Sequence, residues 1–171
     1  KGLYRFKPAA SEAKARAQLI GSGAILNEVV RAQAMLAKYR GGADVWSATS
    51  YNELYRDAHR VERWNLLHPT EKPRVPYVTE CLGSAPGVVV AASDYLKSQP
   101  DMLARWIGKP MVTLGTEGFG RSEDRAALRR GILAEHYRVL ERLLARDRAA
   151  RRPSCAGRGR RRSWPCTPGK R

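Results

Sequence analysis

The sequence lacks the features that mark secreted, membrane-spanning or zinc-binding proteins. Its three cysteines, Cys81, Cys155 and Cys166, form no CxxC pair and have no histidine at zinc-ligand spacing. This pattern argues against a disulfide framework or a zinc site and favours a reducing compartment. The longest apolar run, residues 88–92, is far shorter than the ~20 residues that a membrane span needs. We therefore predict a soluble, cytoplasmic protein without a membrane partner.

The sequence also has no methionine at its first position and no apolar leader. The chain begins with Lys1, and no apolar stretch with a cleavage signature follows it. We expect a piece of a longer polypeptide, without a secretory signal. Its 171 residues are enough for one domain with a proper core, whereas a second domain would be crowded.

Positive charge is abundant but uneven. The net charge is +16, and residues 148–171 alone hold nine Arg or Lys and no acid. This Arg-, Gly-, Pro- and Ser-rich end has too little apolar surface to offset its ordering entropy, so we expect a disordered tail. A basic tail favours nucleic-acid binding through phosphate neutralisation. Only Trp164 offers an aromatic platform there, so we expect non-specific binding at most.

Strand and helix patterns alternate before the tail. Tyr4 and Phe6 alternate with charged residues, which indicates a short edge strand. A strand, a helix and a strand within about thirty residues predict a right-handed βαβ unit and a parallel sheet. The expected strands cover residues 18–23, 44–47, 77–82, 88–92 and 111–114; the expected helices cover residues 24–39, 50–68 and 98–107, with another beginning at Ser122.

The helix over residues 50–68 has the densest set of polar groups in the chain. Ser50 and Glu53 have the spacing of a capping box, in which each side chain binds a backbone N–H of the first turn. Leu54, Ala58 and Val61, with Trp64, form a stripe that should pack on a sheet. The other faces are rich in charge and end at a His68-Pro69 stop.

Three stretches could have a chemical function, and each also has a simpler structural interpretation. Glu62, Arg63 and His68, with His59 nearby, could supply an acid, a base and an anion clamp, although an ion-paired or interfacial face is the better interpretation. Residues 21–23 could bind an anion, but a dinucleotide fingerprint would need glycine at Leu26, so a tight turn is favoured. Residues 115–125 lack the Lys-Ser/Thr ending of a P-loop and are more simply turns around Phe119. A small-molecule site at the carboxyl ends of the strands is a further possibility.

Several segments carry a family resemblance, which covers about residues 1–130 continuously and in order. They are QLIGSGAILNEVVRAQAMLA, DVWSATSYNELYRDAHRVERWNLLHP, PRVPYVTE, ASDYL and VTLGTEGFGRSEDRAALRR. Together they resemble the C-terminal domain of the homodimeric bacterial pyruvate dehydrogenases, the thiamine-dependent decarboxylating components of the pyruvate dehydrogenase complex. More distantly, they are similar to the C-terminal domain of transketolases.

The resemblance implies a three-layer α/β domain with a mixed, mostly parallel sheet of about five strands and helices on both faces. It also implies the reaction of the parent enzyme, which decarboxylates pyruvate on thiamine diphosphate and passes the acetyl group to a lipoyl group. In the family, thiamine diphosphate and magnesium are bound by preceding domains through a Gly-Asp-Gly motif that this sequence lacks. We therefore expect no catalytic, cofactor-binding or metal-binding residue here, and no decarboxylase activity from this chain alone.

The resemblance ends at Gly131. There the family continues into a strand of the form F-E-V-D, which GILAEHYRVLERLL and the Arg-rich end replace. We interpret this as a truncated or frameshifted end. The expected organisation is a leading segment over residues 1–16, an α/β domain over residues 17–147 and a tail over residues 148–171.

The leading hypothesis is a structural and dimer-interface domain. Its partners would be the remaining domains of the subunit, a second subunit and the acyltransferase component of the complex. The alternative is a stand-alone basic protein that binds nucleic acid through its tail. The interface or scaffold candidates are Ser50, Glu53, Glu62, Arg63, Trp64, His68, Phe119 and Arg121.

Overall fold

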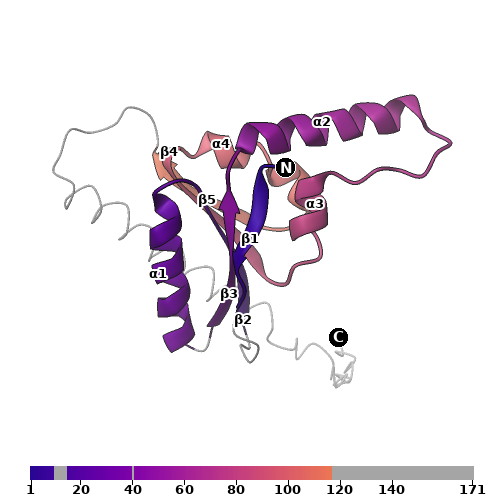
Figure 1. Cartoon of the computed structure of the whole chain (residues 1–171). Helices are drawn as coiled ribbons and strands as arrows, with labels where there is room; N and C mark the ends of the chain where they lie inside the picture. Colours follow the sequence, from indigo (N-terminus) through magenta and orange to yellow (C-terminus); the bar gives the residue numbers. More distant parts are fainter. Residues whose placement is uncertain (10–14, 40, 117–171) are drawn as a thin grey trace, which may run out of the picture.

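The computed structural model describes residues 1–9, 15–39 and 41–116. Their strands form one five-stranded sheet in the order β1-β3-β2-β4-β5 (Figure 1). Strand β1 is antiparallel to β3, and the other neighbours are parallel. This confirms the mixed, mostly parallel sheet and the edge strand around Tyr4 and Phe6. The strands are β1 (Leu3–Lys7), β2 (Ala15–Gly21), β3 (Gly41–Ala48), β4 (Val88–Leu96) and β5 (Met111–Thr116).

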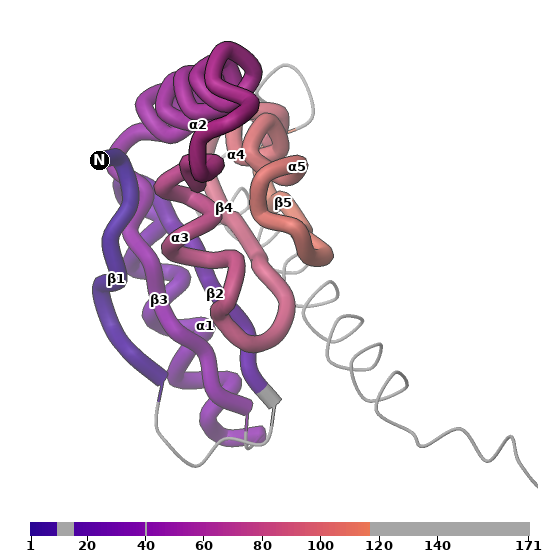
Figure 2. Tube along the Cα trace, turned by 90° about the vertical axis from the view of Figure 1, so that its right-hand side faces the viewer, coloured from indigo at the N-terminus to yellow at the C-terminus, as the bar shows by residue number. Residues whose placement is uncertain are grey.

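Helices cover both faces of the sheet, as expected for three layers. Helix α1 (Ile25–Lys38) lies on one face, while α2 (Tyr51–Leu67), α3 (Tyr77–Leu82) and α5 (Ala104–Ile107) lie on the other. Figure 2 shows α3 in front of the sheet and α1 behind it. Successive strand residues point to opposite faces, so Leu19 packs in the core under α1 and Ile20 in the core under α2.

The β2–α1–β3 unit follows directly from its sequence. Val29, Gln33 and Leu36 recur at helical spacing and are the buried residues of α1. A Cβ at Gly21 would lie 2.9 Å from Val29 Cγ2 and 3.0 Å from Leu26 Cα. A glycine there lets the helix pack closely on the strand end, which supports the turn interpretation of residues 21–23.

The prediction of a strand over residues 77–82 is wrong. These residues form helix α3, with Val78 and Leu82 buried at i and i+4. The Tyr-Val-Thr start favours a strand locally. The first helical N–H, from Tyr77, is instead bound by Asp57 Oδ2 of α2 at 2.9 Å. This cap is 20 residues away in sequence, so local propensity could not reveal it.

The single helix expected over residues 98–107 is also wrong, because it is broken. Helix α4 covers Ser98–Asp101 and α5 covers Ala104–Ile107. Lys97, rather than Ser98, is the N-cap of α4, without a side-chain cap bond. Leu103 N–H bonds to Pro100 O at 3.1 Å, and this tighter i→i−3 bond interrupts the α-helical ladder. The stop at Gly108 is confirmed, with φ of 68°.

The bounds of the other predicted helices and strands are confirmed within a few residues. Strand β1 contributes Leu3 to the core, although the sequence predicts residues 1–16 as a leading segment outside the α/β domain. The domain boundaries at residues 17 and 147 stay predictions. The predicted helix from Ser122, the altered end after Gly131 and the disordered tail lie outside the described residues.

Candidate functional site

Only one of the two hydrogen bonds of the predicted capping box forms at the start of α2. Glu53 N–H donates to Ser50 Oγ at 3.2 Å, as expected for an N-cap. The reciprocal bond is replaced, because Ser50 N–H donates to Gly2 O at 3.2 Å. The Glu53 carboxylate pairs with Arg56 Nη1 at 2.8 Å instead. Ser50 is therefore a helix cap, and Glu53 belongs to the exposed face.

The Glu62 carboxylate joins α2 to α5. Its Oε1 accepts a hydrogen bond from Trp106 Nε1 at 2.8 Å and one from Arg105. His59 Nδ1 lies 3.5 Å from Glu62 Oε2, and the His59 ring makes an edge contact with Trp106. The hydrogen bonds from Arg105 and Trp106 lower the pKa of Glu62. A carboxylate kept ionised in this way suits an inter-helix tie and not a general acid.

Trp64 and His68 lie together near the end of α2. Their rings are stacked, with centroids 4.4 Å apart, and the Arg74 guanidinium lies 3.7 Å from the Trp64 centroid. Asn65 holds the same loop by two bonds: its Nδ2 donates to Arg74 O at 2.9 Å, and Arg74 N–H donates to its Oδ1 at 2.8 Å. The loop after α2 is thereby fastened to the helix. Arg63 is exposed beside this cluster.

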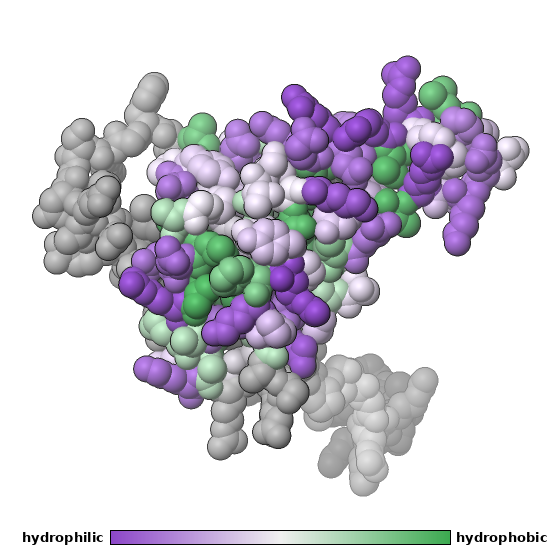
Figure 3. All heavy atoms as spheres, viewed as in Figure 1, coloured by the Kyte–Doolittle hydropathy of each residue, from purple (hydrophilic) through white to green (hydrophobic). Residues whose placement is uncertain are grey.

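We call residues 61–76, the outer part of α2 and its return loop, the α2 arm. The buried residues of α2 are Tyr51, Leu54 and Ala58, so the predicted stripe reaches the core only up to Ala58. Beyond that point the helix projects past the sheet (Figure 1). Leu66 and Leu67 at its end are 81% and 64% exposed. Figure 3 shows apolar atoms at the far end of the arm among charged ones.

The alternative site for a small molecule is the carboxyl edge of the sheet, where residues 21–23, 49–50 and 115–120 would converge. Strands β2 and β3 are neighbours in the sheet, and several polar groups at this edge already have partners. Thr49 N–H and Ser50 N–H both donate to Gly2 O, and Ser22 Oγ accepts a hydrogen bond from Tyr95 OH at 2.9 Å. The N–H groups of Thr49 and Ser50 and the Tyr95 hydroxyl are therefore used within the fold. Residues 117–120 of the glycine-rich stretch lie outside the described residues.

Tyr51 is a buried group at this edge that the sequence did not single out. Its ring packs edge-on to Tyr95 with centroids 6.5 Å apart. Within the described part of the chain its hydroxyl has no hydrogen-bond partner. Burial, with a smaller contribution from Tyr95, raises the pKa of Tyr51. The phenol therefore stays neutral and acts as part of the core.

The described ranges contain no group of three His, Cys, Asp or Glu that could hold a metal ion. A depression of about 410 Å³ lies on the exposed side of α2, lined by Glu53, Tyr55, Arg56, His59 and Arg60. All these lining residues come from one helix, so no second described element brings polar groups to this depression. Within the same residues, no helix is long and apolar enough to cross a membrane.

The sequence did not identify Arg74, Asn65, Arg105 or Trp106 as partners of the candidates. Trp106 lies 44 residues from Glu62 in sequence, so spacing carries no signal of this contact. The candidates Ser50, Glu62, Trp64 and His68 do make the contacts described above. Phe119 and Arg121 lie outside the described residues.

Comparison with known proteins identifies the fold family. A family model, the transketolase-like TK C-terminal domain, matches residues 2–133. The chain belongs to this family. The match starts at β1, includes every described helix and strand, and accounts for the mixed sheet with helices on both faces.

Curated relatives agree with this assignment. A pyruvate dehydrogenase E1 component of Pseudomonas aeruginosa is 49% identical over 131 residues, which are 75% of this chain and 15% of that protein. The corresponding component of Cupriavidus necator is 43% identical over 141 residues, 81% of this chain and 16% of that protein. That of Escherichia coli is 44% identical over 131 residues, 75% of this chain and 14% of that protein. This chain therefore matches the C-terminal region of these relatives and spans about one seventh of their length.

Proposed function

We propose that this chain is the C-terminal part of a pyruvate dehydrogenase subunit and acts as a structural and dimer-interface domain. The parent enzyme would decarboxylate pyruvate and pass the acetyl group to lipoyl groups of an acyltransferase component. The remaining domains of the subunit, a second subunit and that acyltransferase would be its partners, in the cytoplasm. The observation that carries the proposal is the 49% identity to the C-terminal region of such a subunit.

We infer that the described residues do not hold thiamine diphosphate. A diphosphate needs several free backbone or side-chain donors at one point, and magnesium needs carboxylate or carbonyl oxygens. At the carboxyl edge Gly2 O takes the N–H groups of Thr49 and Ser50, and the Ser22 and Tyr95 hydroxyls bind each other. The whole sequence also lacks a Gly-Asp-Gly motif. We therefore assign cofactor binding and the chemical steps to domains outside this chain.

The geometry supports a scaffolding role instead. Leu54 and Ala58 anchor α2 in the core, Glu62 ties it to α5, and Asp57 starts α3. A rigid helix that is anchored at one end and exposed at the other is suited to contact a neighbouring domain. The dense polar groups of α2 support this architecture and not an acid–base reaction.

Two assays test the proposed function. The purified chain, supplied with thiamine diphosphate, magnesium, pyruvate and a lipoyl acceptor, should show no acetylating turnover; measurable turnover would overturn the structural role. The second assay uses the full-length Pseudomonas aeruginosa relative with its matched segment replaced by residues 2–133 of this chain. This chimera should dimerise and decarboxylate pyruvate. A chimera that folds but stays monomeric and inactive would contradict the proposal.

A further inference from the structure

We propose that the α2 arm is the docking element by which this domain binds the preceding, cofactor-carrying part of its own subunit. Leu66, Leu67 and Val75 would enter an apolar cleft of that part, rimmed by carboxylates. The inference rests on the proposed function, because it needs the longer subunit. To the proposed function it adds which surface of the domain makes the contact, which part of the subunit it binds, and which kinds of side chain meet there.

The apolar end of the arm is not needed by the domain itself. Leu66, Leu67 and Val75 are 81%, 64% and 50% exposed. At ~100° per residue, Leu66 and Leu67 lie roughly 120° and 140° around the helix from Leu54. Because Leu54 is fixed in the core with 1% exposure, rotation of α2 cannot bury these leucines against the sheet. Three exposed apolar side chains on one projecting element indicate a contact surface.

The arm is held in a fixed shape before any partner binds. The paired bonds between Asn65 and the Arg74 backbone close the loop. Stacking of Trp64 with His68 and with the Arg74 guanidinium adds a second fastening. A preformed surface loses less conformational entropy when it binds, so more of the contact energy appears as affinity.

Charge around the arm defines the chemistry of the partner. Arg63, Lys72 and Arg74 are exposed, and Glu71 is the exposed acid between them. No ion pair ties Arg63 or Lys72 to another of the described residues. A matching surface would therefore place carboxylates around an apolar centre. A second arm related by twofold symmetry would instead oppose the same cations, which disfavours arm-to-arm contact between two copies.

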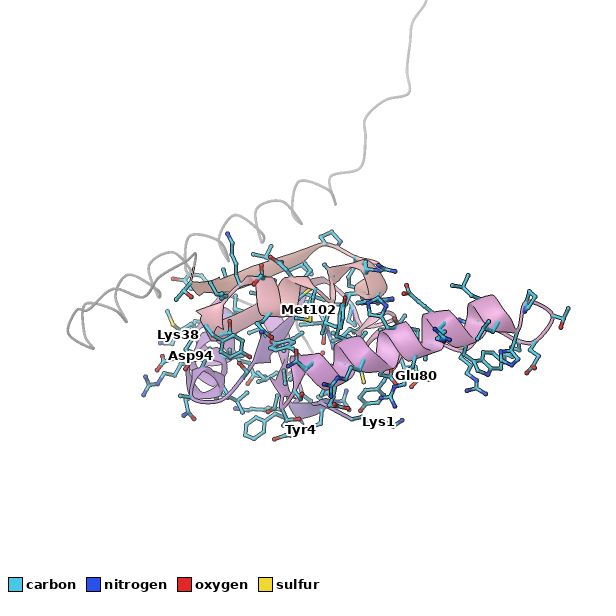
Figure 4. The ribbon with its side chains drawn as sticks, turned by 90° about the horizontal axis from the view of Figure 1, so that it is seen from above. Lys1, Tyr4, Lys38, Glu80, Asp94 and Met102 are labelled. Carbon is cyan, nitrogen blue, oxygen red and sulfur yellow. The ribbon has the colours of Figure 1, made fainter. Side chains whose placement is uncertain are left out.

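The position of Lys1 indicates which partner can reach the arm. Its Nζ lies 4.7 Å from the centroid of Tyr77 on α3, and Gly2 O binds the start of α2. Figure 4 shows Lys1 and Glu80 on the same flank of α2. This chain matches the C-terminal region of its relatives and about 15% of their length, so most of such a subunit would precede Lys1. That polypeptide would enter beside α2 and α3, on the face of the sheet that carries the arm.

Hydrogen–deuterium exchange tests the docking. The 171-residue chain is compared with the full-length chimera that carries its residues 2–133. We expect amides of residues 61–76 to exchange at least about tenfold more slowly in the full-length protein, because docking opposes local opening. The double variant Leu66→Asn/Leu67→Asn should abolish this difference. The control Met35→Asn, at a 43% exposed residue of α1, should keep it.

Four other outcomes of these experiments would contradict the docking. An active chimera whose arm exchanges as fast as in the isolated chain would overturn the docking and leave the proposed function standing. An inactive, unassembled chimera would remove the proposed function and the docking with it. If the isolated chain dimerises and the double variant makes it monomeric, the arm binds a second copy and the inference is wrong. If the double variant unfolds the isolated chain, the leucines serve its own fold, which also overturns the inference.

Discussion

The two halves of helix α2 have similar polarity in sequence and different roles in the structure. The inner half holds the buried residues Tyr51, Leu54 and Ala58. The outer half ends in Leu66 and Leu67, which are among the most exposed apolar side chains of the described residues. Hydrophobicity alone therefore does not tell a core residue from a contact residue. What separates them is whether the sheet extends beneath the helix.

The polar residues of α2 also have different roles in its inner and outer halves. Ser50 and Asp57 bind backbone N–H groups and so complete the fold. Trp64 and His68 stack with each other, and Trp64 also lies under Arg74 of the return loop. Glu62 stands between the halves and binds α5. Substitutions along α2 should thus change stability most near its start and least near its end.

The largest expected loss of stability is at Leu54. Leu54→Ala leaves a cavity in the core under α2 and should lower the free energy of unfolding by about 3 kcal/mol. The matched change Leu66→Ala should alter it by less than about 0.5 kcal/mol, because that side chain is in solvent. Urea unfolding of the full chain, followed by circular dichroism, measures both. Equal losses would mean that the two halves do not differ.

Asp57 should have the next largest effect. Asp57→Ala removes the acceptor for Tyr77 N–H and should destabilise the protein by about 1–2 kcal/mol. Asp57→Asn keeps a side-chain oxygen and should recover most of the loss. The same unfolding assay checks both variants. A neutral Asp57→Ala would show that α3 does not depend on its cap from α2.

These contacts also explain what the sequence could and could not predict. The βαβ unit, the α2 boundaries and the edge strand β1 follow from local periodicity and turn residues, which act over a few positions. Helix α3 was missed because its cap comes from Asp57 on another helix. The partners of Glu62 and Trp64, Trp106 and Arg74, are brought close only by the fold. Local spacing and residue type found the polar candidates on α2, but they could not show which of them touch.

The cap of α2 offers a smaller and more specific test. Ser50→Ala should cost about 1 kcal/mol, since Glu53 N–H loses its acceptor. Glu53→Ala should cost less than about 0.5 kcal/mol, because Gly2 O and not the Glu53 carboxylate binds Ser50 N–H and the exposed pair with Arg56 contributes little. A complete capping box, in which the Glu53 carboxylate binds Ser50 N–H, predicts comparable losses for both variants. Unfolding midpoints of the two variants, with Ser50→Asp as the control that keeps an acceptor, separate the two arrangements.

The smallest expected effect is the pH dependence contributed by Glu62. Its pKa is lowered in the folded protein by the hydrogen bonds from Arg105 and Trp106. A carboxyl group with a lowered folded pKa stabilises the protein above its unfolded pKa, near 4.3, and this stabilisation is lost as the pH falls through the folded value. The wild-type chain should therefore unfold at slightly higher urea than Glu62→Gln at pH 7, with the difference vanishing in acid. Because the pair is partly exposed, added salt should also reduce the difference. A difference that persists unchanged at pH 3 would show that Glu62 joins α2 to α5 by packing and not by charge.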